Sequence, residues 1–155
     1  MTDTQNAVDQ LCTFRLGPLY LGIDVRDVRE VVQHADVTMV PNADPAIEGL
    51  INLRGQIATA IDLCRRLEVE PADTGREPIH LVILSDGEPV TLLVDSIGDV
   101  IDVDSSAYEP PPATMTGIAR DLILGAYKLQ DELLLILDIQ KAVELHPSDA
   151  EDVAS

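Results

Sequence analysis

The residues that could carry chemistry are sparse in this chain of 155 residues. His34, His80 and His146 are isolated from one another, and none has a second histidine or a cysteine at the spacing of a metal site. His80 lies in an apolar run, where a core histidine is a better interpretation than a ligand or base. The sequence contains no glycine-rich phosphate loop and no serine in a nucleophile-elbow pattern. It therefore predicts a protein without catalytic residues, metal ions or cofactors.

Two further groups of reactive side chains have structural interpretations. Asp99, Asp102 and Asp104 resemble a calcium cluster but lack the glycine and terminal glutamate of an EF-hand loop, so we expect a solvated strand edge. Cys12 and Cys64 lie far apart in apolar contexts. We expect reduced core thiols, since disulfides are rare in cytoplasmic proteins.

The most informative stretch of the sequence runs from residue 49 to residue 63. Apolar residues alternate on both sides of Arg54-Gly55, at Ile51, Leu53, Ile57 and Ile61. This pattern predicts two half-buried strands joined by a two-residue turn, in which glycine provides the positive φ that tight hairpins need. The turn carries one long cationic side chain, Arg54.

The same stretch occurs a second time, 76 residues later. Gly49 corresponds to Gly125 and Asp62 to Asp138, and both aspartates are placed to cap a short helix. The turns differ, because the second copy has Gln130-Asp131 where the first has Arg54-Gly55. A feature present in only one copy of a duplicated fold is a better candidate for function than for folding, so the sequence points to Arg54.

The remaining segments read mainly as strands. Asp24 is expected to cap a short helix that carries Val25, Val28 and Val31 or Val32, with Arg26 and Glu30 paired on its outer side. Further strands are expected at 11–16, 19–24, 37–40, 79–84, 90–94 and 97–103, with short helices at 63–67 and 139–145 and an extended proline segment at 108–112.

The composition restricts the class of partner. The formal net charge of −18 repels nucleic acid and anionic membranes. No run of about 18 apolar residues is present, and residues 1–5 do not resemble a signal peptide. We therefore expect a cytoplasmic protein that does not insert into a membrane.

Short strands, regular turns and the internal repeat predict an all-β fold with a few short helices, built as two small barrels packed together. We expect a flexible N-terminus at 1–9, one domain over 10–146 with the connection between its halves near 68–78, and an acidic disordered tail at 147–155.

Motifs along most of the chain resemble those of the CheW family of chemotaxis coupling proteins. The central motif is Gly49-x-Ile51-Asn52-Leu53-Arg54-Gly55, followed by a strand and Asp62-Leu63. Supporting motifs are Phe14-x-Leu16-Gly17, Tyr20-x-Gly22-Ile23, Val28-x-Glu30-Val31, Pro41, Val94-Asp95, Pro110-Pro111-Pro112, Gly125 and Leu137-Asp138-Ile139. One departure is Ala58-Thr59-Ala60, where the family usually has a proline.

The resemblance implies two intertwined five-stranded SH3-like barrels. It also implies a non-catalytic adaptor that couples the cytoplasmic tips of chemoreceptors to the regulatory domain of a CheA-type histidine kinase, and is recruited to receptor arrays at the inner face of the membrane. Partner contacts are expected at Val28, Glu30, Asn52, Arg54 and Gly55, with Gly49 as a structural turn residue. The alternative is a small-ligand-binding or catalytic β-barrel that uses the groove between the barrels.

The candidate residues can also be interpreted as purely structural. Arg54 could be a solvated turn residue whose surface ion pair contributes less than about 1 kcal/mol to stability. Val28 could belong to the core, and Asn52 could simply satisfy backbone groups of the turn. The two function classes differ in one respect: the adaptor needs only protein surfaces and shows no turnover.

Overall fold

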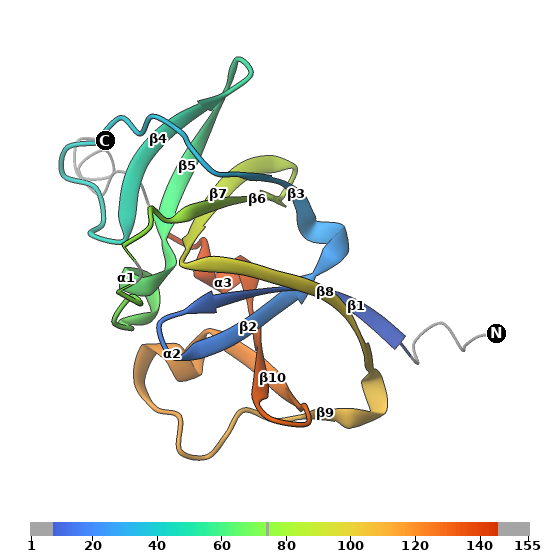
Figure 1. Cartoon of the computed structure of the whole chain (residues 1–155). Coiled ribbons are helices and arrows are strands. Elements are labelled where there is room, and N and C mark those ends of the chain that lie inside the picture. Colours follow the sequence, from blue (N-terminus) through green and yellow to red (C-terminus); the bar gives the residue numbers. More distant parts are fainter. Residues whose placement is uncertain (1–7, 74, 146–155) are drawn as a thin grey trace.

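The computed structural model describes residues 8–73 and 75–145. In this part of the chain the fold is mostly β, with two sheets of six and five strands and three short helices. None of its helices has both the length and the apolar character required to cross a membrane. The sheets lie side by side, and the β4–β5 hairpin projects from the second sheet at the top of the view (Figure 1).

The first sheet contains six strands in the order β8-β1-β2-β11-β10-β9. Their bounds are β1 (Val8–Leu16), β2 (Leu19–Asp24), β8 (Ser96–Asp104), β9 (Tyr108–Glu109), β10 (Ile123–Lys128) and β11 (Leu133–Leu137). All neighbouring pairs are antiparallel except β2 and β11, which are parallel.

The second sheet contains five strands in the order β3-β6-β7-β5-β4. Their bounds are β3 (Val28–Val32), β4 (Ile47–Leu53), β5 (Gln56–Asp62), β6 (Ile79–Ser85) and β7 (Glu88–Val94). Here β5 and β7 form the parallel pair. The helices are α1 (Leu63–Leu67), α2 (Gly117–Asp121) and α3 (Ile139–Ala142).

Each sheet takes strands from both halves of the chain. The β1–β2 hairpin of the first half pairs with β8 and β11 of the second, and the β6–β7 hairpin of the second half pairs with β3 and β5 of the first. The halves are thus interleaved, in agreement with the duplication read from the sequence. The expectation of five strands in each unit holds for the second sheet and is wrong for the first, where the short strand β9 adds a sixth. Closure of the sheets into barrels stays a prediction.

One central core joins the sheets and the helices. It includes Phe14 from β1, Leu63 from α1, Leu92 from β7 and Ala142 from α3, all fully buried. Burial of these aliphatic side chains supplies the main driving force for packing the sheets together. Cys12 and Cys64 are free, buried thiols, as expected.

His80 is a core residue, as the sequence predicted, but the expectation that its polar atoms are satisfied is not met, since its Nδ1 has no hydrogen-bond partner among the described residues. Its side chain lies on β6 with 5 % of its surface exposed. Burial lowers the pKa of the imidazole, since the neutral ring is favoured where water is excluded.

The helix expected after Asp24 is wrong. Only one 3-10 turn forms, over Val25–Asp27, and β3 follows it. The β-branched valines find strand partners on β6, and this pairing overrides the helical spacing. The expected Arg26–Glu30 pair is consequently absent from the described contacts: Arg26 instead donates to Asp24, at 2.7 Å.

Other differences are smaller. The strand expected at 37–40 is a single bridge between Thr38 and Leu50, α3 ends at Ala142, and α2 was not predicted. Ile57 is 57 % exposed, because it lies opposite Asn52 in the hairpin, whereas Ala58 lies opposite the buried Ile51. The expected flexible N-terminus and acidic tail fall largely on residues 1–7 and 146–155, outside the described residues.

Candidate functional site

The tip of the β4–β5 hairpin is a two-residue turn formed by Arg54 and Gly55. Both residues have positive φ, 56° and 89°, as the hairpin turns that match strand twist require. Glycine adopts this conformation freely, but an arginine there carries backbone strain of about 1–2 kcal/mol. A second two-residue turn with positive φ at both positions, Asp86-Gly87, has the residues usually found there. Arg54 is therefore not the choice that local folding favours.

A carboxylate from β3 fixes the direction of the Arg54 side chain. Nη2 of Arg54 donates to Oε1 of Glu30 at 3.0 Å. The Glu30 side chain is 27 % exposed, whereas that of Arg54 is 84 % exposed. The guanidinium is thus held at one end and keeps most of its N–H donors toward solvent, where a planar fork can bind a carboxylate or backbone carbonyl.

Asn52 and Gly49 support the hairpin. Oδ1 of Asn52 accepts a hydrogen bond from the Gly55 N–H at 2.7 Å, so its side chain closes the turn. Gly49 has φ 154°, and a Cβ at this position would collide with the Thr38 carbonyl and the Val37 side chain. Gly49 is therefore a structural residue, required for the close approach of two backbones.

The structure brings Glu30 and Arg54 together but leaves Val28 apart from them. A pocket of about 190 Å³ lies beside the tip and is lined by Arg29, Glu30, Leu53, Arg54, Gln56, Val82 and Pro89. Val28 is absent from this lining and packs, half-buried, against the central core. A register shift in β3 between Val28 and Glu30 separates the two side chains.

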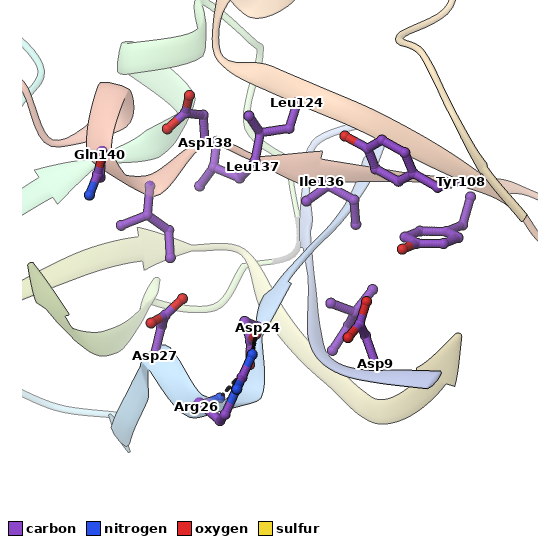
Figure 2. A pocket seen from close by; sticks show the side chains of 13 residues that line it. Asp9, Asp24, Arg26, Asp27, Tyr108, Leu124, Ile136, Leu137, Asp138 and Gln140 are labelled. Atoms are coloured by element: carbon purple, nitrogen blue, oxygen red, sulfur yellow. Dashed lines mark hydrogen bonds and ion pairs between the residues drawn. The ribbon is translucent and has the colours of Figure 1, made fainter. Parts of the chain in front are cut away.

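Sequence reasoning missed an acidic cleft at one end of the first sheet (Figure 2). It has a volume of about 620 Å³, and its lining includes Asp9, Asp24, Asp27 and Asp138. Asp9 lies in β1, Asp24 ends β2, Asp27 lies in the 3-10 turn that follows, and Asp138 caps α3, so no local motif could have indicated the cluster.

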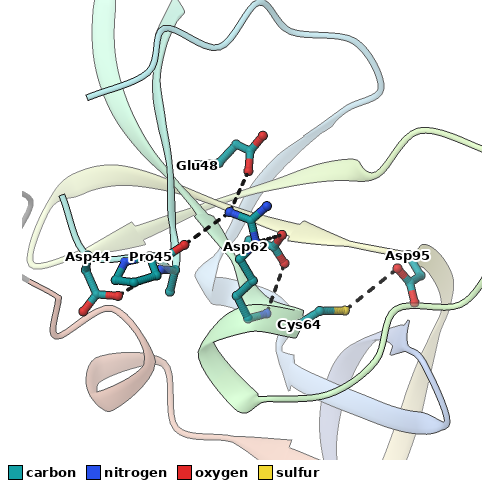
Figure 3. Close-up of polar contacts among 8 residues, drawn as sticks. Asp44, Pro45, Glu48, Asp62, Cys64 and Asp95 are labelled. Atoms are coloured by element: carbon teal, nitrogen blue, oxygen red, sulfur yellow. Dashed lines mark hydrogen bonds and ion pairs between the residues drawn. The ribbon is translucent and has the colours of Figure 1, made fainter. Parts of the chain in front are cut away.

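A second missed cluster surrounds Arg65 at the end of the first repeated hairpin (Figure 3). Arg65 reaches Glu48 at 3.6 Å and Asp62 at 3.4 Å, and it donates to the Pro45 carbonyl at 3.3 Å. Oδ1 of Asp62 also accepts from the Arg65 N–H at 3.3 Å, which confirms the predicted cap of α1. Glu48 and Arg65 are replaced by Leu124 and Lys141 in the second copy, and this difference can be found by aligning the two copies of the sequence.

Asp95 anchors the connection between the halves. Its Oδ2 accepts from the Gly17 N–H at 2.6 Å and from the Ala72 N–H at 2.8 Å. Cys64 lies beside it, with Sγ 4.0 Å from Oδ1. Burial, with Asp95 and Asp62 adding to it, raises the pKa of the Cys64 thiol to about 12, so this thiol is unreactive.

The loop of the second hairpin is held differently from the first. Arg15 on β1 makes a bidentate contact with Glu132, with both distances 2.9 Å. Its guanidinium also lies 4.2 Å from the centre of the Tyr20 ring. The cation at the second hairpin, Arg15, therefore comes from strand β1, whereas the cation at the first hairpin, Arg54, lies in the turn itself.

Comparison with known proteins gives one consistent family. The model of the CheW-like domain matches residues 10–146. The chain is 35 % identical over 136 residues to the chemotaxis protein CheW of Treponema pallidum, with 85 % of this chain and 80 % of that relative covered. It is 28 % identical over 153 residues to CheW of Bacillus subtilis, with 97 % and 96 % covered.

A solved structure shares the fold. The crystal structure of the scaffolding protein TtCheW from Thermoanaerobacter tengcongensis superposes with a TM-score of 0.80 at 30 % identity. The superposition covers 90 % of this chain and 95 % of that one. Sequence and structure thus point to the same set of relatives.

Proposed function

This chain belongs to the CheW family, the non-catalytic scaffolds of chemotaxis signalling, and from this premise we propose that its Arg54 hairpin tip binds a partner of the signalling complex. We further propose that the partners are the regulatory domain of a CheA-type histidine kinase and the cytoplasmic tips of chemoreceptors. The protein would act in the cytoplasm, on receptor arrays at the inner face of the membrane. Each sheet would close into a small SH3-like barrel.

The observation that carries this proposal is the strained, oriented and exposed Arg54. Its positive φ is unfavourable for arginine, its guanidinium is fixed by Glu30 at 3.0 Å, and 84 % of its side chain is open to solvent. An exposed ion pair contributes at most about 1 kcal/mol to stability, so it does not explain the choice of arginine. Arginine is, in contrast, enriched among residues that dominate the affinity of interfaces.

The other expected contact residues fit this proposal to different degrees. Glu30 would orient Arg54, and Asn52 would fix the turn through the Gly55 N–H. Gly55 would leave the tip open, since no atom lies within 4 Å of a Cβ built there. Val28 would contribute through β3, away from the tip. The alternative expected from sequence was a small-ligand-binding or catalytic barrel that uses the groove between the barrels. Its catalytic form is set aside because members of this family are non-catalytic, and its ligand-binding form stays a prediction.

The test is charge reversal at the tip with a matched control in the second hairpin. Arg54→Glu and Lys128→Glu change the net charge equally, and Lys128 is an exposed strand residue of β10. Binding to the purified kinase regulatory domain and to a receptor-tip fragment of the same organism is measured by calorimetry. We expect Arg54→Glu to raise Kd for at least one partner by about 30-fold or more, and Lys128→Glu to change it less than threefold.

A swapped pair separates contact from orientation. Glu30→Arg combined with Arg54→Glu restores an ion pair of opposite sense across the same two strands. If Arg54 contacts the partner, this double variant folds normally and still fails to bind. Wild-type affinity of a folded Arg54→Glu variant for both partners would overturn the proposal.

A further inference from the structure

The acidic cleft in the first sheet has an apolar floor. It opens where β1, β2, β10 and β11 come together near α3, and its volume is about 620 Å³ (Figure 2). Buried side chains of Leu11, Tyr127 and Leu137 form the floor. At its edge, Leu124 is 52 % exposed and Tyr108 is 44 % exposed. Two large, partly exposed apolar side chains therefore flank one concave surface.

The edge of this cleft carries more negative than positive charge. Arg26 is taken up by Asp24 at 2.7 Å, and the Asp138 carboxylate caps α3 by accepting from the Lys141 N–H at 3.2 Å. Asp9 and Asp27 also line the cleft, and Arg26 is close enough to interact electrostatically with both, although no ion pair joins it to either within the described residues. The lining thus contains four carboxylates and one guanidinium. Burial, and then the nearby Asp24 carboxylate, raises the pKa of Asp27, while Arg26 acts in the opposite direction and does not cancel them.

The internal repeat provides a control for this observation. Glu48 and Leu124 occupy equivalent positions, each the extra residue of a β-bulge in its hairpin. In the first copy Glu48 is joined to Arg65, which also reaches Asp62, so the strand end is closed by ion pairs (Figure 3). In the second copy Leu124 carries no charge, and no equivalent pair can form. The fold therefore does not require an apolar, unpaired residue at the bulge position that Leu124 occupies.

We propose that this cleft binds a short cationic amphipathic segment of a partner protein. A lysine or arginine of that segment would lie between Asp9 and Asp27, and a neighbouring apolar residue would cover Leu124 and Tyr108. An arginine would also gain from stacking on the Tyr108 ring. The cleft shares no lining residue with the pocket beside Arg54, so this is a second surface.

Charge complementarity selects this occupant over the alternatives within the chain itself. Residues 147–155 contain Asp149, Glu151 and Asp152 and no lysine or arginine, so repulsion disfavours the chain's own terminus. A second copy of the chain carries the same net charge of −18. A basic segment, in contrast, would be attracted at long range and would bind less tightly as salt is raised.

The experiment uses the full chain and a labelled peptide of alternating leucine and arginine residues. Fluorescence anisotropy gives the Kd, and methyl resonances of leucine and isoleucine locate the peptide. We expect Asp9→Asn with Asp27→Asn to raise Kd about fivefold, since each exposed charge pair contributes modestly. Asp73→Asn with Asp131→Asn removes the same charge from two exposed loop residues and should change Kd less than twofold.

A further variant and a control peptide make the result specific. Leu124→Gln removes the apolar contact at an exposed position without changing the net charge, and should also weaken binding. The Leu124, Ile136 and Ile139 methyl signals should shift on titration, and a peptide with glutamine in place of arginine should not bind. Equal weakening by the two aspartate pairs, or shifts confined to residues outside the cleft, would overturn the proposal. Because Arg54 is tested separately, failure here leaves the proposed hairpin contact intact.

Discussion

The two repeated hairpins share the features that build the fold and differ in the features that face solvent. In both, a bulge precedes the glycine, at 47–49 and at 123–125. In both, the aspartate at the strand end donates its N–H to a carbonyl 16 residues earlier at 2.8 Å, Asp62 to Ala46 and Asp138 to Leu122, and caps the next helix. The two copies therefore share the same bulge, the same backbone hydrogen bond and the same helix cap.

The exposed parts of the two hairpins have diverged. The first tip is a two-residue turn that presents Arg54. The second tip is a four-residue loop, which is closed by a hydrogen bond from the Leu129 N–H to the Glu132 carbonyl. The Glu132 carboxylate of this loop is held by Arg15. At the opposite end, Glu48 pairs with Arg65 while Leu124 stays unpaired beside the acidic cleft. A duplicated fold thus separates residues that folding needs from residues free to acquire a function.

The largest expected effect comes from the shared glycines. Gly49→Ala should lower the free energy of unfolding by about 2–4 kcal/mol, because the new Cβ meets the rigid Thr38 backbone at a φ unfavourable for alanine. Gly125→Ala should cost less, because Gly125 does not have a positive φ and the half-exposed Tyr108 ring can move, which leaves the Glu109 carbonyl, 2.7 Å from the new Cβ, as the backbone obstacle. Urea denaturation of both variants measures the difference. A larger loss at Gly125 would show that the two bulges are not equivalent in rigidity.

A second prediction concerns a thiol that only one copy contains. Cys64 on α1 corresponds to the exposed Gln140 on α3. The pKa of the buried thiol is raised to about 12 from 9.0, so the folded state keeps the proton that the unfolded state loses. Stability from this group is complete below pH 9 and is lost as pH rises toward 12, by about 1.4 kcal/mol at pH 10.

The measurement compares wild type with Cys64→Ala between pH 7 and pH 10.5. The variant lacks the buried thiol, so its free energy of unfolding should fall less steeply above pH 9 than that of wild type. The difference between the two curves isolates Cys64 from the lysines and tyrosines that titrate in the same range. Parallel curves would mean that the thiol is more hydrated than its 6 % exposure indicates.

The comparison also explains which features the sequence could predict. The Arg54-Gly55 turn, the caps at Asp62 and Asp138 and the family all follow from local spacing or from motifs, and the structure or the comparisons confirm them. The strand at 28–32 was missed because it depends on partners on β6, about 50 residues away. Long-range pairing of this kind decides between helix and strand when the local pattern allows both.

The candidate contact residues also differ in whether the sequence alone could predict them. Asn52 and Gly55 lie within the turn, so their spacing is informative. The Glu30–Arg54 pair joins two strands 24 residues apart, and the cleft around Asp9 and Asp27 depends on the interleaving of the two halves. No property of a single segment encodes that interleaving. The Glu48–Leu124 difference is visible when the two copies are aligned, but without the fold it does not indicate a cleft.

The smallest expected effect tests the comparison at the tip. Arg54→Asn should raise the free energy of unfolding by about 0.5–1 kcal/mol, because asparagine tolerates positive φ and loses only an exposed ion pair. Arg54→Lys, which keeps the charge and the strain, should leave stability unchanged. Thermal and urea unfolding of both variants provide the measurement. A gain in stability for Arg54→Asn would mean that arginine at this position destabilises the fold, as expected for a residue kept for binding. A loss of stability would mean that the ion pair with Glu30 outweighs the backbone strain. The tip would then differ from the second hairpin for structural reasons.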